Sequence, residues 1–135
     1  MKNIILILSS FFLFSCSDIY QPAVVSARKE ASQIGLEIMK NGGNAYDAMI
    51  ATHLALAVVH PTAGNIGGGG FFVYHHEDGS SGSLDFREMA PGNAFKDMYL
   101  DENGDVIPDM STLGGAAVGV PGSISVIYEI HAKFG

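Results

Sequence analysis

The sequence predicts a mixed α+β fold in which helices pack on a largely antiparallel sheet. Three features predict it: two successive stretches with helical spacing of apolar residues, an aromatic segment typical of a β-hairpin, and a last helical stretch. Of the 135 residues, 47% are hydrophobic and 16% are charged, which excludes a disordered chain. A chain of this length forms one modest core, so we expect one domain or part of one.

The N-terminus has the pattern of an export signal. Lys2 precedes an apolar run over residues 4–14, which Ser15 and Cys16 follow. As a helix this run rises about 16 Å, whereas the hydrocarbon core of a bilayer is about 30 Å thick. We therefore predict a signal peptide over residues 1–15, in preference to a membrane span or a buried helix of the mature fold.

Cys16 is the single cysteine, which excludes an intrachain disulfide. Residues 13–16, Leu-Phe-Ser-Cys, resemble a bacterial lipobox, in which the signal is cut before the cysteine and the thiol receives lipid. We expect a lipidated Cys16, a tether over residues 16–24, and an exported lipoprotein in the periplasm or on the outer surface. An ordinary signal peptide with an incidental cysteine is the alternative.

The charge of the chain limits its partners. The formal net charge is −7, and loss of residues 1–15 removes one basic residue and no acid. An acidic chain of this kind argues against nucleic acid as a partner. Since no basic cluster remains for anionic headgroups, we expect membrane attachment only through the lipid.

Two helices open the domain expected over residues 25–135. The first has apolar residues at helical spacing and ends at a glycine pair: Ala27, Ala31, Ile34 and Ile38, then Gly42 and Gly43. In the second, over residues 45–59, Asn44 is the predicted cap, and Pro61 stops the helix. This helix is apolar nearly all round, which predicts burial against other layers.

A β-hairpin and a further helix are expected next. Residues 71–76 are aromatic and β-branched, residues 77–82 supply a turn, and residues 83–87 extend again. Both faces of the first strand are apolar, which predicts a central strand covered on two sides. After a weakly patterned stretch with a turn at Asn103-Gly104, the last helix is expected to open at Ser123 as its cap.

Three segments look like known binding motifs, for phosphate, calcium and a metal ion, but each lacks a feature that its motif requires. The glycines over residues 64–70 precede a strand, whereas a phosphate cradle needs a helix N-terminus, so we expect them to allow close approach of a ligand or a second chain segment. The Asp101-x-Asn103-x-Asp105 stretch lacks the glycine and glutamate of a calcium loop. The histidines lack chelating spacing: His75 and His76 should point to opposite faces of a strand, and His53 is expected to be a hydrogen-bonded core histidine.

Arg87 is the candidate binding residue. On the second hairpin strand Leu84 and Phe86 share one face, and Asp85 and Arg87 share the other. A guanidinium in that position can hold a carboxylate in a two-bond fork, a geometry that lysine cannot supply. A surface arginine paired with Asp85 or Glu88, without function, is the alternative that composition and spacing leave open.

Five segments of the chain resemble, in order, motifs of the γ-glutamyltranspeptidase family. They are Gly-Gly-Asn-Ala-Tyr-Asp-Ala at 42–48, Ala-Val-Val-His-Pro at 57–61, Gly-Asn-Ile-Gly-Gly-Gly-Gly-Phe at 64–71, Asp-Phe-Arg-Glu-Met-Ala-Pro at 85–91 and Gly-Val-Pro-Gly at 119–122. The match spans about residues 23–135, and several long motifs in order are far more specific than any single one.

The resemblance implies an N-terminal-nucleophile hydrolase, an αββα sandwich, with only the N-terminal part of the large subunit in this chain. Such a precursor cuts itself into large and small subunits, and a threonine freed at the new N-terminus attacks the γ-glutamyl amide with its own amine as base. The γ-glutamyl group then passes to water or to an amino acid or peptide. Glutathione is the usual donor, and neither cofactor nor metal is implied.

The resemblance also assigns site residues. The arginine of Asp-Phe-Arg-Glu maps onto Arg87, which would hold the α-carboxylate of the γ-glutamyl group. Thr52, Thr62 and Thr112 lie inside the matched segment and do not map onto the nucleophile, so we expect no catalytic residue here and no activity from this chain alone. The alternatives are a related acylase, a poly-γ-glutamate-cleaving enzyme of the same fold, or a non-catalytic lipoprotein remnant.

Overall fold

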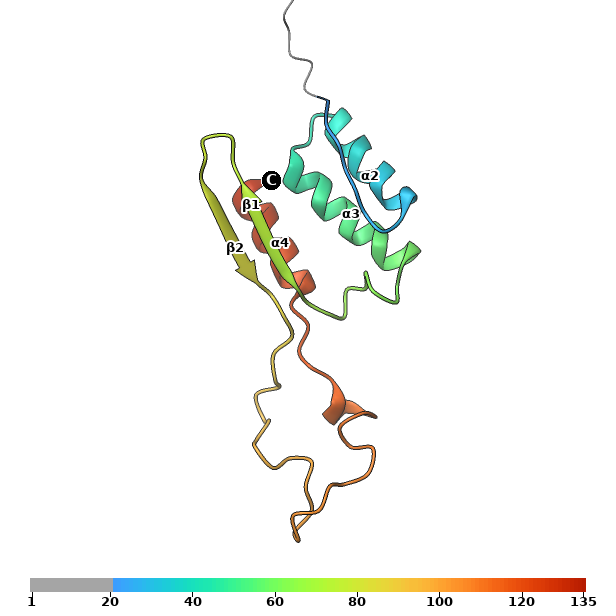
Figure 1. Ribbon diagram of the computed structural model, residues 1–135, viewed down its shortest axis with the longest axis vertical. Helices are drawn as coiled ribbons and strands as arrows, with labels where there is room; N and C mark the ends of the chain where they lie inside the picture. Colours follow the sequence, from blue (N-terminus) through green and yellow to red (C-terminus); the bar gives the residue numbers. More distant parts are fainter. Residues whose placement is uncertain (1–20) are drawn as a thin grey trace, which may run out of the picture.

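The computed structural model describes residues 21–135, so the predicted signal peptide, Cys16 and the first part of the tether lie outside the described residues. The elements are, in order, α2 (Lys29–Lys40), α3 (Ala45–Val59), β1 (Phe71–His75), β2 (Ser81–Asp85), the short 3-10 helix η2 (Gly115–Ala117) and α4 (Ser123–Phe134). Figure 1 shows α3 between α2 and α4, with the β-hairpin lying against α4. The predicted mixed α+β architecture is confirmed for this part of the chain.

Helix α2 ends where its glycines predict. Gly42 has a φ of +98°, and its N–H donates to Met39 O at 3.2 Å while Gly43 N–H donates to Ile38 O at 3.0 Å. This pair of bonds satisfies carbonyls that the helix end leaves free. At the other end the helix begins at Lys29, so the predicted first apolar position, Ala27, precedes it.

Helix α3 has the predicted bounds because local chemistry sets both ends. Asn44 Oδ1 accepts from the N–H groups of Tyr46 at 2.8 Å and Asp47 at 3.0 Å, and Asp47 Oδ2 accepts in return from Asn44 N–H at 3.1 Å. This reciprocal capping box satisfies three backbone donors. Asn44 Nδ2 also donates to Phe134 O at 2.6 Å, which joins the start of α3 to the end of α4.

The prediction that α3 is buried all round is wrong for the described residues. Ala48 and Thr52, which face α2, are buried, whereas Leu54 is 43% and Val58 is 79% exposed. In the described part of the chain, α3 is covered by α2 on one side and by α4 and the hairpin on another, and the rest of its apolar surface is exposed.

The hairpin forms, with different strand limits. β1 and β2 pair antiparallel in a register that sets Phe71 opposite Asp85, so the second strand begins two residues earlier and ends two residues sooner than predicted. The prediction of a central strand covered on both faces is also wrong within residues 21–135. The sheet there has two strands, and Phe71 and Val73 are 66% and 75% exposed on the face away from α4.

Helix α4 supplies much of the small core. Val126 and Ile130 are buried at 5% and 1% exposure, and an aromatic cluster joins its C-terminal end to α3 and β1. Within that cluster the rings of Tyr46 and Phe134 stack with centroids 4.5 Å apart. The predicted capping role of Ser123 is wrong: Gly122 is the N-cap, and the Ser123 hydroxyl instead donates to Gly68 O at 2.9 Å.

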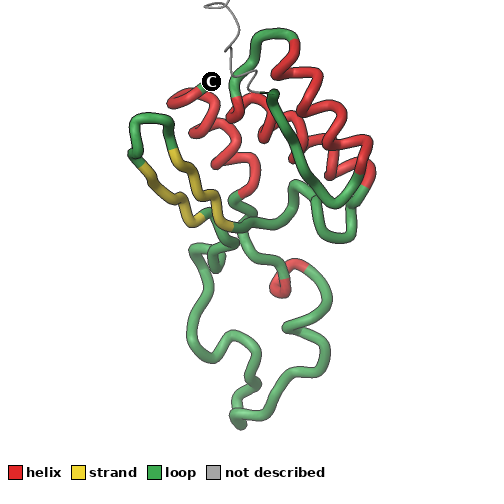
Figure 2. The backbone as a smooth tube through the Cα atoms, turned by 45° about the horizontal axis from the view of Figure 1, so that its top comes forward, coloured by secondary structure: helices red, strands yellow, loops and turns green. Residues whose placement is uncertain are grey.

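A long loop separates β2 from α4. Figure 2 shows it extending away from the helices and the hairpin, with η2 as its short helical turn. The predicted turn at Asn103-Gly104 is confirmed, since Gly104 has a φ of +85° and Leu100 and Val106 form an isolated bridge around it. In the described part of the chain, no helix combines the length and apolarity that crossing a membrane requires.

Candidate functional site

Three chain segments that are far apart in sequence meet where the hairpin ends. We call this place the glycine junction: residues 68–70, 86–89 and 119–123. Gly68 O accepts from the N–H groups of Gly122 at 3.1 Å and Ser123 at 3.2 Å, and Met89 and Val120 exchange two backbone bonds of 3.1 and 2.8 Å. Three of the motif segments of the sequence are therefore one structural unit.

Glycine is required in this junction because backbone meets backbone. A Cβ at Gly69 would lie 2.7 Å from Arg87 Cα and would clash with the Phe86 carbonyl oxygen. A Cβ at Gly122 would also clash with this oxygen. The prediction that the glycine run admits a close second chain segment is confirmed, and that segment is the one that carries Arg87.

Arg87 lies two residues beyond the end of β2. The ladder continues for one bond, from Phe86 N–H to Gly70 O at 2.9 Å, and then Met89 changes partner to Val120. The predicted alternation persists across this point: Leu84 and Phe86 are half-buried, while Asp85 and Arg87 are exposed. The prediction that Arg87 belongs to the strand is wrong, because the close approach of Gly69 ends regular pairing there.

The guanidinium of Arg87 has two neighbours. Its Nε and Nη2 atoms each lie 3.3 Å from a different carboxylate oxygen of Asp85, and Arg87 N–H donates to Asp85 Oδ1 at 3.0 Å. These bonds, the backbone one first, hold the pKa of the Asp85 carboxyl below its ordinary value. The second neighbour is the ring of Phe71: Arg87 Cζ lies over it, 5.0 Å from the ring centroid. The ion pair between Arg87 and Asp85, which the sequence left as an alternative, is present, and both side chains are more than half exposed.

Arg87 and Asp85 line an open cleft of about 340 Å³ between the end of the hairpin, the glycine junction and α4. Its charged lining residues are Asp85, Arg87 and Glu129, and its other walls are mostly apolar. A larger hollow of about 440 Å³, between residues 23–27 and α3, has no Asp, Glu, Lys or Arg in its lining. The cleft at Arg87 is therefore the candidate site, since it combines small-molecule size with convergent polar groups.

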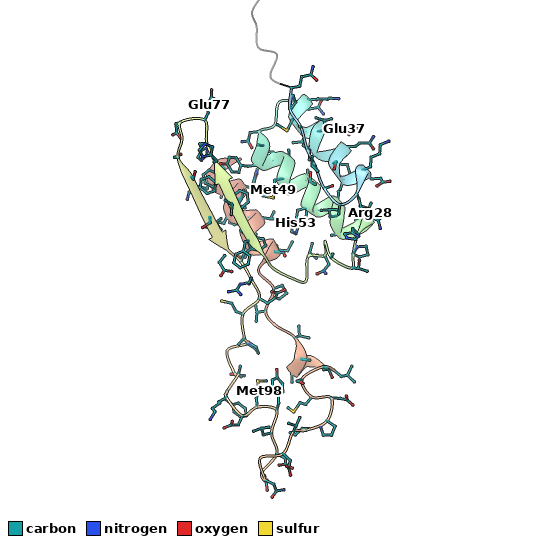
Figure 3. The ribbon with its side chains drawn as sticks, viewed as in Figure 1. Arg28, Glu37, Met49, His53, Glu77 and Met98 are labelled. Atoms are coloured by element: carbon teal, nitrogen blue, oxygen red, sulfur yellow. The ribbon has the colours of Figure 1, made fainter. Side chains whose placement is uncertain are left out.

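The histidines lie away from this cleft. His75 bonds with Ser81 Oγ at 2.7 Å and His76 with Tyr46 Oη, so the two point to opposite faces as predicted. The predicted hydrogen bond of His53 is absent: its buried Nε2 has no partner among the described residues, because apolar side chains surround it. Figure 3 shows Met49 and His53 on the side of α3 that faces α4 and the hairpin.

The other groups that the sequence singled out, Thr52 and the calcium-like stretch, do not line the Arg87 cleft. No cluster of three potential metal ligands occurs among residues 21–135. Asp101 of the calcium-like stretch accepts backbone bonds from Asn103 and Asp105 and forms a loop, as predicted. Thr52 is buried and donates to Ala48 O in its own helix. Sequence reasoning missed Phe71 and Ser123, whose partners become visible only through strand register and the glycine junction.

The backbone matches part of two solved structures. It fits the γ-glutamyltranspeptidase of Helicobacter pylori with a TM-score of 0.79 and 45% identity, over 88% of this chain and 34% of that one. The γ-glutamyltranspeptidase of Pseudomonas nitroreducens, solved in complex with L-DON, gives 0.78 and 44%, over 88% and 35%. These likenesses define the chain as a mixed α/β segment of an N-terminal-nucleophile hydrolase.

Sequence comparison makes the assignment specific. Residues 31–135 match the model of the gamma-glutamyltranspeptidase family. The glutathione hydrolase proenzyme of Pseudomonas sp. (strain A14) is 53% identical over 112 residues, which cover 83% of this chain and 20% of that protein. The chain belongs to the gamma-glutamyltranspeptidase family, as its motifs predict, and it spans about a fifth of the length of the curated relatives it matches.

Proposed function

We propose that this chain is the N-terminal part of an exported γ-glutamyltransferase and glutathione hydrolase, and that Arg87 binds the α-carboxylate of the γ-glutamyl donor. The observation that carries the proposal is the position of Arg87 on the wall of an open cleft, at the junction of three family motifs. A guanidinium binds a carboxylate through two parallel N–H···O bonds, which fix the direction as well as the place of the ligand.

The charge of the cleft supports an amino acid group as its ligand. The cleft is lined by one guanidinium, that of Arg87, and by two carboxylates, those of Asp85 and Glu129, so the lining is formally negative by one charge. A simple anion gains little from such a site, whereas a group with both a carboxylate and an ammonium finds a partner for each charge. The γ-glutamyl group of glutathione has this pair of charges on its α-carbon.

In the proposed reaction this chain binds and orients the donor. An N-terminal threonine of a small subunit, cut from the same precursor, attacks the γ-carbonyl with its own amine as base, and the amine product leaves. Water or an amino acid then takes the γ-glutamyl group from the threonine ester. The large and small subunits together would form the αββα sandwich. The proposed steps need no cofactor or metal.

The N-terminal residues support a location for this enzyme. We propose export under a signal peptide over residues 1–15 and lipid attachment at Cys16, which would place the enzyme on a membrane facing the periplasm or the outside. The supporting observation is the Leu-Phe-Ser-Cys pattern after an apolar run. Mass spectrometry of the N-terminal peptide tests it, and an unmodified or uncut Cys16 would contradict it.

Substitution of Arg87 in the full reading frame tests the binding role. Arg87→Ala should raise the Michaelis constant for a γ-glutamyl anilide about 10- to 100-fold, since bonds between charged partners contribute about 1.5–3 kcal/mol. Arg87→Lys should restore only part of the loss, because an ammonium cannot form the two-bond fork. Arg28→Ala, at an exposed arginine outside the cleft, is the control. An unchanged Michaelis constant in Arg87→Ala would refute the role.

A further inference from the structure

We propose that Asp85 and Phe71 are positioning residues that hold the Arg87 guanidinium so that it binds the donor's α-carboxylate end-on, through Nη1 and Nη2. The proposal rests on the function proposed above for Arg87. It adds two side chains and a binding direction that this function does not itself require.

Asp85 is anchored independently of the guanidinium. It is the last residue of β2, paired across the hairpin with Phe71. Its Oδ1 atom accepts from Arg87 backbone N–H at 3.0 Å, so the carboxylate stays in place whichever way the arginine side chain turns. A carboxylate fixed by the backbone is a support for the guanidinium, whereas a freely rotating counterion would be displaced by the ligand.

The direction of ligand binding follows from counting donors. A guanidinium has five N–H groups, one on Nε and two on each Nη. Asp85 takes the Nε–H and one N–H of Nη2, the side edge of the fork, at 3.3 Å each. Three N–H groups are left: one on Nη1 and one on Nη2 lie side by side and form the end edge, and the second on Nη1 points back toward Cδ. A carboxylate from the cleft therefore has one complete fork available, the end-on one.

Phe71 fixes the plane of the guanidinium. The register sets Phe71 opposite Asp85, and Arg87 is two residues further along, so the ring lies diagonally across the hairpin from the arginine. Arg87 Cζ lies 5.0 Å from the ring centroid, within the range of cation–π attraction. Asp85 holds one edge of the guanidinium and the Phe71 ring lies against it, which leaves the end edge for a ligand in the cleft.

Asp85→Asn and Phe71→Leu in the full reading frame test the proposal. We expect Asp85→Asn to raise the Michaelis constant for a γ-glutamyl anilide about 3- to 5-fold, the upper part of the range for an exposed ion pair, with an unchanged kcat. Phe71→Leu should raise it about 2- to 5-fold, and Phe71→Tyr should restore it because the ring face is kept. Asp78→Asn is the matched control, since Asp78 accepts a similar backbone bond, from Ser80 at 2.8 Å, in the hairpin turn away from the cleft.

A donor without the α-carboxylate separates positioning from general damage. For 4-aminobutyryl anilide, kcat/KM should be the same in Asp85→Asn and the unsubstituted enzyme. A lower Michaelis constant in Asp85→Asn would overturn the proposal, because Asp85 would then compete with the substrate. An equal loss on both donors would also overturn it, as a structural effect.

The Arg87→Ala variant distinguishes this proposal from the function on which it rests. If Arg87→Ala raises the Michaelis constant and neither Asp85→Asn nor Phe71→Leu does, only the positioning roles fail. If Arg87→Ala itself has no effect, the binding role of Arg87 fails first. If Asp85→Asn does not accumulate as folded protein, Phe71→Leu and its rescue by tyrosine decide the outcome.

Discussion

Gly69→Ala should destabilise the protein although it adds a single methyl group. The added Cβ would lie 2.7 Å from Arg87 Cα and 2.9 Å from Arg87 C, and it would clash with the Phe86 carbonyl oxygen. All three are backbone atoms, so no side-chain rotation relieves the contact. Separating the two segments would lengthen the bond from Phe86 N–H to Gly70 O, which is 2.9 Å long here.

We expect a loss of about 2–3 kcal/mol in the free energy of unfolding, the upper part of the range for overpacking. Urea unfolding of the protein from the full reading frame, followed by circular dichroism, measures it. Under the proposed function the variant should also bind the donor more weakly, since a shift at Arg87 Cα moves the guanidinium.

Gly92→Ala is the matched control. Gly92 directly follows the motif at residues 85–91, has no positive φ, and has no atom within 4 Å of the position that its Cβ would occupy as alanine. The substitution should change the free energy of unfolding by no more than about 0.5 kcal/mol. Equal stability of Gly69→Ala and Gly92→Ala would refute the argument that close backbone approach selects glycine at the junction.

Two further predictions concern helix capping and pH. Asn44→Ala should lower the free energy of unfolding by about 1–2 kcal/mol in the same urea assay, because it removes the capping box and the bond to Phe134 O. The backbone bonds that Asp101 accepts, from Asp105 first and then Asn103, hold its pKa below the ordinary value. Its stabilising effect on the loop is therefore present at neutral pH and is lost as the pH falls below about 4. In Asp101→Asn the change in the chemical shift of the Asn103 amide over that range should become smaller, and an unchanged titration would contradict this.

The sequence predicts those features whose causes are local. Asn44 and Pro61 bracket α3 because a cap and a stop act within a turn of themselves. The glycine pair after α2 and the turn at Asn103-Gly104 also depend on residues only a few positions away. In each case the bonded groups are only a few residues apart, so the residue types and their spacing are enough to predict the bond.

Features that depend on distant partners escape local reasoning. Ser123 has the side chain of a cap, yet its hydroxyl bonds to Gly68, 55 positions away, so a long-range contact replaces the local one. The end of β2 depends on Gly69, and Phe71 approaches Arg87 only in the register that the structure shows. The motif is enough to predict Arg87 as a candidate binding residue, whereas the contact of Phe71 with its guanidinium cannot be predicted from the sequence.

The exchange of two backbone bonds between Met89 and Val120 ties the two ends of the long loop together. Because its ends are fixed, extra residues in the loop add only closure entropy, about 0.6 kcal/mol for each doubling of its length. Inserted residues in this loop should therefore leave the Arg87 cleft in place. The exposed tip at Asn103-Gly104 is accordingly the place to insert an affinity tag or a fluorescent label without disturbing the site.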